Sequence, residues 1–265
     1  MHKQMKKGIL LVVCFFVVYG AQVMYTKSKG TREELVVLGY HHIVPDKDKE
    51  TYYKNDMWVV SCSDFEQQMK LAHDLGYQSI SLEQVYNWKE EGGSLPAKSF
   101  VVSFDDGFYS TTKFAQPILE KYGFKGNVFV IASSIAKESL QYNPSKKQHA
   151  SLSDMSDTSV LQYYSHSFDL HHKSSKGFKV DLLTKSALQE DVENANKFVS
   201  STYYAYPYGK YNDKILQVLK ENHTKLAFSY NENRKVKRSD DNFALPRFNV
   251  NGFTNIDVFL QMLES

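Results

Sequence analysis

Short apolar runs suited to buried strands alternate with helical segments along most of this chain, and this alternation restricts its fold more than any other feature. The expected strands lie at residues 35–40, 100–104, 127–132, 161–165, 203–206, 226–230 and 245–250. The expected helices lie at residues 63–76, 114–122, 182–199 and 214–222. Strands that alternate with helices form parallel sheets, and this many units predict an α/β fold closed into a barrel. The active site of such a barrel lies where strands end and loops begin.

The first helix has the clearest start signal. Ser63 stands in the capping position and Glu66 follows three residues later, which is the spacing of a capping box. Apolar residues then recur at helical spacing until Gly76, where the helix is expected to end.

The chain begins with Lys3, Lys6 and Lys7, followed by an apolar run at residues 8–25. Positive residues before a run of this length are typical of a secretory signal or a signal anchor, although the run is slightly shorter than the ~20 residues that span a bilayer comfortably. We expect a signal anchor or signal peptide at residues 1–26, a short stalk at residues 27–34, and one folded domain at residues 35–265. This leader predicts an N-terminal membrane helix with the domain outside the cell, or a secreted, surface-associated protein if the leader is cleaved.

The composition favours one globular core and argues against nucleic-acid binding. Of the 265 residues, 42% are apolar and 23% are charged, which is ordinary for a globular domain of this size. The net charge of +2 becomes about −3 when the five lysines of the first thirty residues are removed. A nucleic-acid partner usually requires a basic face, which a mildly acidic domain lacks. Cys62 is the only cysteine of the expected domain, so the domain forms no internal disulfide.

Two adjacent aspartates, Asp105 and Asp106, follow the expected strand at residues 100–104 and precede Gly107. Adjacent side chains on a strand point to opposite sides, so one aspartate would hold a metal while the other faces a substrate. A solvated turn is the alternative, because Asp-Gly is a common turn signature.

A histidine pair, His166 and His171, follows the strand expected at residues 161–165. Two imidazoles and one carboxylate bind zinc and other first-row metals and leave positions open for water and substrate, as a hydrolytic metal requires. The alternative is a polar surface loop without a metal.

Three further strand ends carry candidate functional residues. Tyr208 lies in a Tyr-Pro-Tyr-Gly turn, which either is an aromatic turn or offers a rigid backbone N–H to a developing oxyanion. His41 closes the first strand and is a candidate general acid, since the ordinary pKa of histidine lies near neutral pH. Arg247 lies within an apolar strand, where a buried arginine needs an acidic partner such as Asp105 or Asp106.

Three of these segments together resemble the motifs of the NodB-type polysaccharide deacetylase family. The first motif is similar to SFDDG at residues 103–107, the second to HSFDLH at residues 166–171, and the third to AYPYG at residues 205–209. The resemblance extends from about residue 35 to the C-terminus. It implies a distorted (β/α) barrel of this family's type, in which residues 35–265 form the catalytic domain.

The resemblance also implies roles for single residues. Asp106, His166 and His171 would hold one divalent metal ion, for which zinc is expected and cobalt, nickel or iron are alternatives. Asp105 would be the general base that activates the metal-bound water. The backbone N–H of Tyr208 would help to hold the tetrahedral oxyanion.

Three departures from the common family pattern narrow the comparison. Thr202 stands where the third motif usually has arginine, and Arg247 is expected to supply the missing partner of Asp105. The two histidines of the second motif are five residues apart rather than four, and His223 lacks the context of the usual C-terminal catalytic histidine. These departures resemble the permuted branch that deacetylates poly-β-1,6-N-acetylglucosamine in biofilms, in which an early histidine is the general acid. That role falls here on His41.

The resemblance therefore implies a metal-dependent hydrolase that removes N-acetyl groups from an extracellular amino-sugar polymer, with poly-β-1,6-N-acetyl-D-glucosamine as the expected substrate. Peptidoglycan and chitin-like oligosaccharides are alternatives, because the motifs report chemistry at one acetamide only. Other classes of function are a non-catalytic carbohydrate-binding surface protein on the same scaffold and an esterase or amidase for small molecules. The protein is expected to be a monomer. Five aromatic residues are expected either to stack on sugar faces or to pack in the rim: Tyr109, Tyr163, Phe168, Tyr206 and Tyr208.

Overall fold

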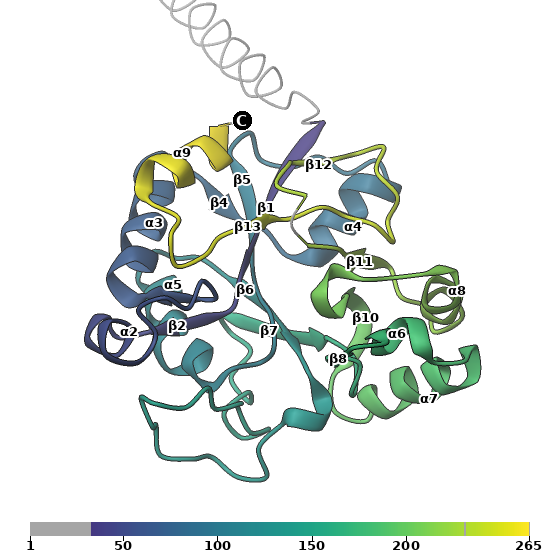
Figure 1. Ribbon diagram of the computed structural model, residues 1–265. Coiled ribbons are helices and arrows are strands. Elements are labelled where there is room, and N and C mark those ends of the chain that lie inside the picture. Colours follow the sequence, from purple (N-terminus) through teal and green to yellow (C-terminus); the bar gives the residue numbers. More distant parts are fainter. Residues whose placement is uncertain (1–32, 231, 265) are drawn as a thin grey trace, which may run out of the picture.

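The structure is a computed structural model that describes residues 33–230 and 232–264. A curled sheet of nine strands forms its centre (Figure 1). These strands are β1 (Glu34–Tyr40), β4 (Gln78–Ser79), β5 (Ser99–Phe104), β6 (Gly126–Val130), β7 (Leu161–Ser165), β10 (Ser200–Ala205), β11 (Leu226–Phe228), β12 (Val236–Lys237) and β13 (Phe248–Asn249). The order is β11-β10-β7-β6-β5-β1-β12, with β13 also paired to β1 and β4 to β5. The core strands pair in parallel, and β12 is antiparallel to β1.

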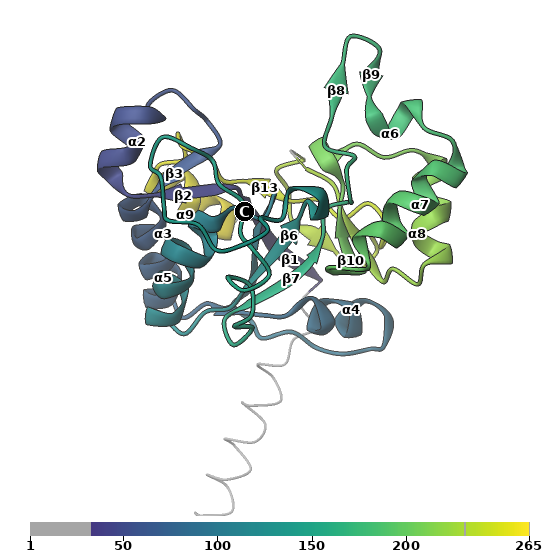
Figure 2. The same ribbon diagram turned by 90° about the horizontal axis from the view of Figure 1, so that it is seen from below.

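Helices cover the outer flanks of this sheet. They are α2 (Asp46–Tyr52), α3 (Cys62–Asp74), α4 (Leu82–Glu90), α5 (Gln116–Lys121), α6 (Lys179–Leu182), α7 (Lys185–Ala195), α8 (Asp213–Glu221) and α9 (Ile256–Glu264). Figure 2 shows α3, α5 and α9 on one flank and α7 and α8 on the other. Two small sheets complete the fold: β2 (His42–Val44) with β3 (Val59–Ser61), and β8 (Lys173–Ser174) with β9 (Gly177–Phe178).

The curled sheet approaches a barrel without a regular closing ladder. A single parallel bridge joins Phe228 at the end of β11 to Leu245, and the chain then continues into β13, which pairs with β1. The parallel α/β sheet agrees with the prediction from alternating strand and helix patterns. The barrel is distorted because its last pairing consists of this short segment.

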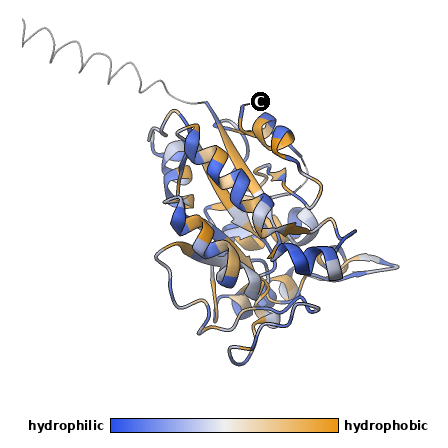
Figure 3. Cartoon of the chain, turned by 90° about the vertical axis from the view of Figure 1, so that its left-hand side faces the viewer, coloured by the Kyte–Doolittle hydropathy of each residue, from blue (hydrophilic) through white to orange (hydrophobic). Residues whose placement is uncertain are grey.

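Side chains that alternate along the strands separate an inner hydrophobic cluster from the clusters outside the sheet, of which the largest lies under α3. On β1, Val37 packs in the cluster that contains Phe129 and Phe228 from other strands of the ring, so this cluster fills the interior. Leu38, the next residue, packs in the cluster that contains Phe65 and Met69 of α3. Figure 3 shows that the central strands are largely hydrophobic, whereas the helices carry both hydrophilic and hydrophobic residues.

The helix α4 was not expected from the sequence, although a start signal for it is present. Ser81 accepts a hydrogen bond from the Gln84 backbone N–H, and the Gln84 side chain accepts one from the Ser81 backbone, which completes a capping box. Leu82, Val85 and Trp88 of this helix are buried in the inner cluster.

Several predicted boundaries were wrong. The helix expected to start at Ser63 is α3, and it is capped by Ser61 instead. The Ser61 hydroxyl accepts a hydrogen bond from the Asp64 N–H, and Ser63 lies within the first turn. The helix expected at residues 182–199 is the shorter α7, which starts after the cap at Thr184, while α6 ends at Leu182, where the expected helix was to begin. The strand expected at residues 245–250 contains only the two residues of β13, with Leu245 in the isolated bridge.

The expected leader at residues 1–26 and most of the stalk at residues 27–34 lie outside the described residues. In the part of the chain that the structure describes, no helix is long and apolar enough to span a membrane.

Candidate active site

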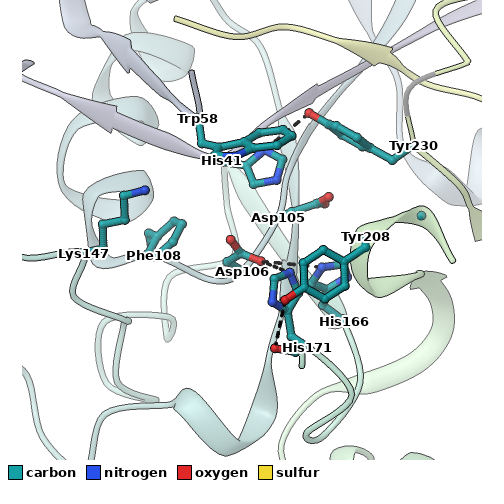
Figure 4. Close-up of a pocket in the computed structure, with 11 residues that line it drawn as sticks. His41, Trp58, Asp105, Asp106, Phe108, Lys147, His166, His171, Tyr208 and Tyr230 are labelled. Carbon is teal, nitrogen blue, oxygen red and sulfur yellow. Dashed lines mark hydrogen bonds and ion pairs between the residues drawn. The ribbon is translucent and has the colours of Figure 1, made fainter. Parts of the chain in front are cut away.

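The expected functional residues converge at the carboxyl ends of the parallel strands. Asp105 directly follows β5, His166 follows β7, and His41 follows β1. These side chains line one cavity of about 380 Å³, together with those of Asp106, His171 and Tyr208 (Figure 4). The structure therefore brings together residues from most of the length of the described chain.

The strand pattern predicted that the two aspartates point to opposite sides, and this prediction was wrong. The strand ends at Phe104, and Asp106 adopts a left-handed backbone conformation with φ of 71°. Such a turn breaks the alternation of a strand, so Asp105 and Asp106 both face the cavity.

Asp106, His166 and His171 form a cluster with the composition and spacing of a metal site. Oδ1 of Asp106 lies 3.6 Å from Nε2 of His166 and 3.4 Å from Nε2 of His171. The three ligand atoms all lie within 4.8 Å of one another. Ligands of a tetrahedral zinc, each bound at about 2.0–2.1 Å, are separated by about 3.3 Å. The observed separations fit a small divalent cation.

The hydrogen bonding of the cluster points to the same conclusion. Nδ1 of His166 lies 2.7 Å from the Ala205 carbonyl oxygen, which can only accept, so Nδ1 carries the proton and Nε2 presents its lone pair. Burial lowers the pKa of His166 to about 3, so the ring is neutral. Oδ1 of Asp106 is buried without a hydrogen-bond partner. A carboxylate oxygen that faces a nitrogen lone pair is stabilised only by a proton or a cation between them, and the second choice fits these residues as metal ligands.

Electrostatics within the site favour an added positive charge. Burial and then the neighbouring Asp105 raise the pKa of Asp106 to about 7. A carboxyl with this pKa is poorly stabilised as an anion by the protein alone. A divalent cation would remove that penalty.

Arg247 pairs with Asp105 rather than with Asp106. Its two terminal nitrogens each donate to one Asp105 carboxylate oxygen at 2.8 Å, and its Nε donates to the Ser229 carbonyl at 2.9 Å. Arg247 is fully buried, and Asp105 is 3% exposed. Burial alone would raise the pKa of Asp105, but the charge and hydrogen bonds of Arg247, together with the nearby His166 and His41, outweigh it and hold that pKa well below its usual range.

Thr202 does not reach this pair. Its hydroxyl lies 2.8 Å from the Ser200 hydroxyl near the start of β10, at the opposite end of the strand from the cavity. The partner of Asp105 is therefore supplied by Arg247 in the segment just before β13, rather than from β10 as in the common family pattern.

His41 lies between two aromatic rings. Its ring centroid is 4.6 Å from that of Trp58 and 5.3 Å from that of Tyr230. The Tyr230 hydroxyl lies 3.4 Å from Nδ1 of His41 and 2.9 Å from Oδ1 of Asn249. Burial lowers the pKa of His41 to about 4, although Asp105 partly offsets this effect.

Tyr208 occupies a tight turn immediately after β10. Its backbone φ is 58°, and the N–H groups of Gly209 and Lys210 close the turn on the Tyr206 and Pro207 carbonyls. The Tyr208 N–H takes part in neither of these bonds. Its ring lies over His171, with the centroids 4.2 Å apart.

Sequence reasoning missed Trp58, Phe108, Lys147 and Tyr230, which also line the cavity. Tyr230 lies two residues after the end of β11, so the strand-end argument would have found it. Lys147 makes an ion pair of 2.6 Å with Asp56, a contact between distant segments that no local pattern reveals.

Among the five aromatic residues for which stacking on sugar or packing was expected, only Tyr208 lines this cavity. Tyr206 is 1% exposed and donates its hydroxyl to the Phe243 carbonyl, so packing is the alternative that holds for it.

A family model described as polysaccharide deacetylase matches residues 92–227, just over half of the chain. The chain belongs to the polysaccharide deacetylase family. The predicted enzyme class, a polysaccharide N-deacetylase, is thereby confirmed over a purely carbohydrate-binding protein. The matched segment contains the three residues of the metal-site cluster together with Asp105 and Tyr208, whereas His41 and Arg247 lie outside it.

Individual relatives extend the similarity over most of the deacetylase chain. It is 27% identical over 239 residues to poly-beta-1,6-N-acetyl-D-glucosamine N-deacetylase of Staphylococcus aureus (strain MSSA476), covering 83% of this chain and 80% of that relative. It is 28% identical over 241 residues to the protein of the same name from Staphylococcus epidermidis, covering 84% and 81%.

Two solved structures share the fold. IcaB from Ammonifex degensii superposes with a TM-score of 0.70 and 23% identity, covering 88% of this chain and 97% of that one. The Streptococcus pyogenes deacetylase PplD in complex with acetate superposes with a TM-score of 0.72 and 22% identity, covering 88% and 99%.

Proposed function

We propose that this polysaccharide N-deacetylase is metal-dependent and removes acetyl groups from poly-β-1,6-N-acetyl-D-glucosamine outside the cell. The observation that carries the proposal is the meeting, in one cavity, of the Asp106–His166–His171 cluster with the arginine-paired Asp105. The choice of polymer rests on the relatives of that name, which match more than four-fifths of this chain.

The three residues of the cluster would act as metal ligands. A divalent cation held by Asp106, His166 and His171 would polarise the acetamide carbonyl and make a water easier to deprotonate. The Ala205 carbonyl fixes the His166 ring so that Nε2 faces this position. We propose zinc, since two imidazoles and one carboxylate suit it, and the same donor set accepts cobalt, nickel or iron.

Asp105 would act as the general base. Arg247 engages one lone pair of each carboxylate oxygen, and each oxygen keeps another with which to accept a proton from the attacking water. The same contact keeps Asp105 ionised and fixes its orientation. The low pKa makes Asp105 a weak base, so the reaction depends on the water being acidified before its proton is transferred.

Tyr208 and His41 would act later in the reaction. The Tyr208 backbone N–H would donate to the developing oxyanion, a contact that stabilises the transition state more than the ground state. His41 would deliver a proton to the departing sugar amine from the opposite wall of the cavity (Figure 4). Because burial lowers its pKa to about 4, the ring is neutral before the reaction, so it would first take up the proton that the attacking water gives to Asp105 and then pass it to the amine. The bond that breaks joins the acetyl carbon to the sugar nitrogen, and acetate and a free amine leave.

We further propose that residues 1–26 attach the enzyme to the membrane or direct its secretion. The basic start and the apolar run at residues 8–25 support this proposal. An extracellular polymer requires such a location. We propose a monomer, in which one chain supplies the whole catalytic site.

The test is release of acetate from poly-β-1,6-N-acetyl-D-glucosamine by the purified full-length chain, with added zinc and with a chelator. Asp105→Asn should abolish release, whereas the matched surface variant Asp257→Asn on α9 should retain it. Release from peptidoglycan or chitin oligomers but not from this polymer would overturn the substrate and keep the chemistry. Release that persists in the chelator would overturn the metal dependence.

A further inference from the structure

A buried carboxylate on α7 holds the loop that carries two of the proposed metal ligands. Asp191 is 7% exposed, and its two oxygens accept hydrogen bonds from the backbone N–H groups of Phe168 at 2.9 Å and Asp169 at 2.8 Å. These two residues lie between His166 and His171 in the sequence. Asp191 itself does not line the cavity, so it does not touch the substrate.

The N–H groups of this loop have few other partners available. Ser167 N–H donates to the Ser165 hydroxyl at 3.1 Å, and Leu170 N–H donates to the Ser167 hydroxyl at 3.0 Å. Both of these acceptors belong to the loop or to the strand that leads into it. Among the N–H bonds at residues 167–170, those to Asp191 alone connect the loop to another element.

The loop needs such a connection because its backbone is strained. Ser167 has φ of 76°, in a region that costs about 1–3 kcal/mol for a residue other than glycine. Strain of this kind persists only when surrounding contacts over-determine the conformation. On the other side of the loop, the N–H groups of Ala132 and Ser133 donate to the carbonyls of Ser167 and Phe168 at 3.0 and 2.9 Å. Asp191 holds the other side of the loop to α7.

A carboxylate suits this position better than its amide counterpart. Its two equivalent oxygens accept from two consecutive N–H groups at once, whereas asparagine offers one oxygen and turns its NH₂ toward the other donor. The exchange of one oxygen for an NH₂ group would therefore release one end of the loop without changing the side-chain volume.

We propose that Asp191 is a positioning residue for the metal site, which sets the separation of His166 and His171 by holding the backbone between them. The inference rests on the proposed ligation by these two histidines. It explains how the five-residue spacing of the histidines places both rings against Asp106. Partners of this kind, once removed, typically weaken metal binding about 10- to 100-fold.

The experiment measures zinc affinity of the full-length chain by competition with a chromophoric chelator, without any polysaccharide. Asp191→Asn is expected to bind zinc about 10- to 100-fold more weakly than the wild type. Glu190→Gln is the matched control, because it makes the same change on the neighbouring exposed residue of α7, and its affinity should equal that of the wild type. Circular dichroism establishes that each variant is folded at the temperature of measurement.

Asp191→Glu is the second variant, and its zinc affinity tests the inference even if Asp191→Asn does not fold. It keeps two acceptor oxygens but shifts them by one methylene, so its affinity should lie between those of the wild type and Asp191→Asn, about threefold weaker than wild type. Equal zinc affinity in the wild type and in every folded Asp191 variant would overturn the inference, even if their unfolding temperatures fall. If the wild type itself binds no zinc, the inference falls together with the proposed metal dependence.

Discussion

Replacement of Arg247 by methionine would leave the Asp105 carboxylate buried without its counter-charge. Methionine is unbranched and apolar, so it fills much of the space and removes the charge and all the donors. The lost contacts include the two 2.8 Å hydrogen bonds to Asp105 and the bond to the Ser229 carbonyl. The guanidinium also lies over the Tyr230 ring, 4.9 Å from its centroid, and this contact is lost as well.

The burial of the pair sets the expected size of the effect. Arg247 is fully buried and Asp105 nearly so, and removal of one partner from a buried pair typically costs about 3–5 kcal/mol. For a domain of this length, 1 kcal/mol corresponds to a change of roughly 2–4 °C in the unfolding temperature. Arg247→Met should therefore lower that temperature by roughly 6–20 °C. The activity should fall as well, because the proposed base loses the contact that orients it.

A surface pair of the same geometry provides the control. Arg234 makes two hydrogen bonds to Asp240, at 2.8 and 3.1 Å, but its side chain is 47% exposed. Solvent screens such a pair, so Arg234→Met should cost about 0.2–1 kcal/mol. Urea unfolding with a chelator present measures both variants, because a bound cation would otherwise compensate the charge of Asp105.

The double variant Asp105→Asn/Arg247→Met separates lost charge from lost packing. If the unpaired carboxylate causes most of the loss, neutralising it should recover at least about 1 kcal/mol relative to Arg247→Met alone. The reasoning is refuted if Arg247→Met costs no more than Arg234→Met, or if the double variant is less stable than Arg247→Met.

Two further substitutions test the walls of the cavity. Gly209→Ala would place a Cβ atom 2.7 Å from the Tyr230 backbone nitrogen at φ of +66°, so the turn must shift and the Tyr208 N–H with it. Since loss of one oxyanion donor costs about 10²–10³ in kcat, we expect at least a tenfold fall in kcat, and a value within twofold of wild type would contradict the proposed donor. Tyr230→Phe removes the hydroxyl near His41 but keeps the ring, so kcat should fall by a larger factor than KM changes. The free energy of unfolding in urea should fall by about 1 kcal/mol. A change in stability alone would show that the hydroxyl does not orient His41.

Apolar runs predicted the strands that lead into the site, because both faces of these strands pack against other parts of the core. The strand expected at residues 161–165 is β7 with the same bounds, and the one expected at residues 100–104 is β5 with one additional residue. All of β5 is buried, whereas β7 is buried at its two ends and partly buried between them. The loop that follows each one was therefore placed at the correct end of the sheet.

Local reasoning failed where a single backbone angle or a distant contact decides the outcome. The left-handed conformation of Asp106 reverses its side chain, and the dipeptide Asp-Gly alone does not specify it. Asp191 lies in a helix whose burial pattern reads as an ordinary amphipathic surface, and only the folded structure shows its carboxylate against the histidine loop. The start of α4, by contrast, was readable from Ser81 and Gln84.

The displaced arginine follows from how this barrel closes. Leu245 makes the one bridge that joins the end of β11 to the segment before β13, and Arg247 follows two residues later on that segment. Beside that bridge, Arg247 Nε donates a hydrogen bond to the Ser229 carbonyl, so a side chain also links this segment to the residue after β11. Because strand ends from all sides of a barrel meet above its core, a long side chain from this last segment reaches Asp105 on the opposite side of β1. The segment that completes the ring therefore also supplies the charge that holds the proposed base.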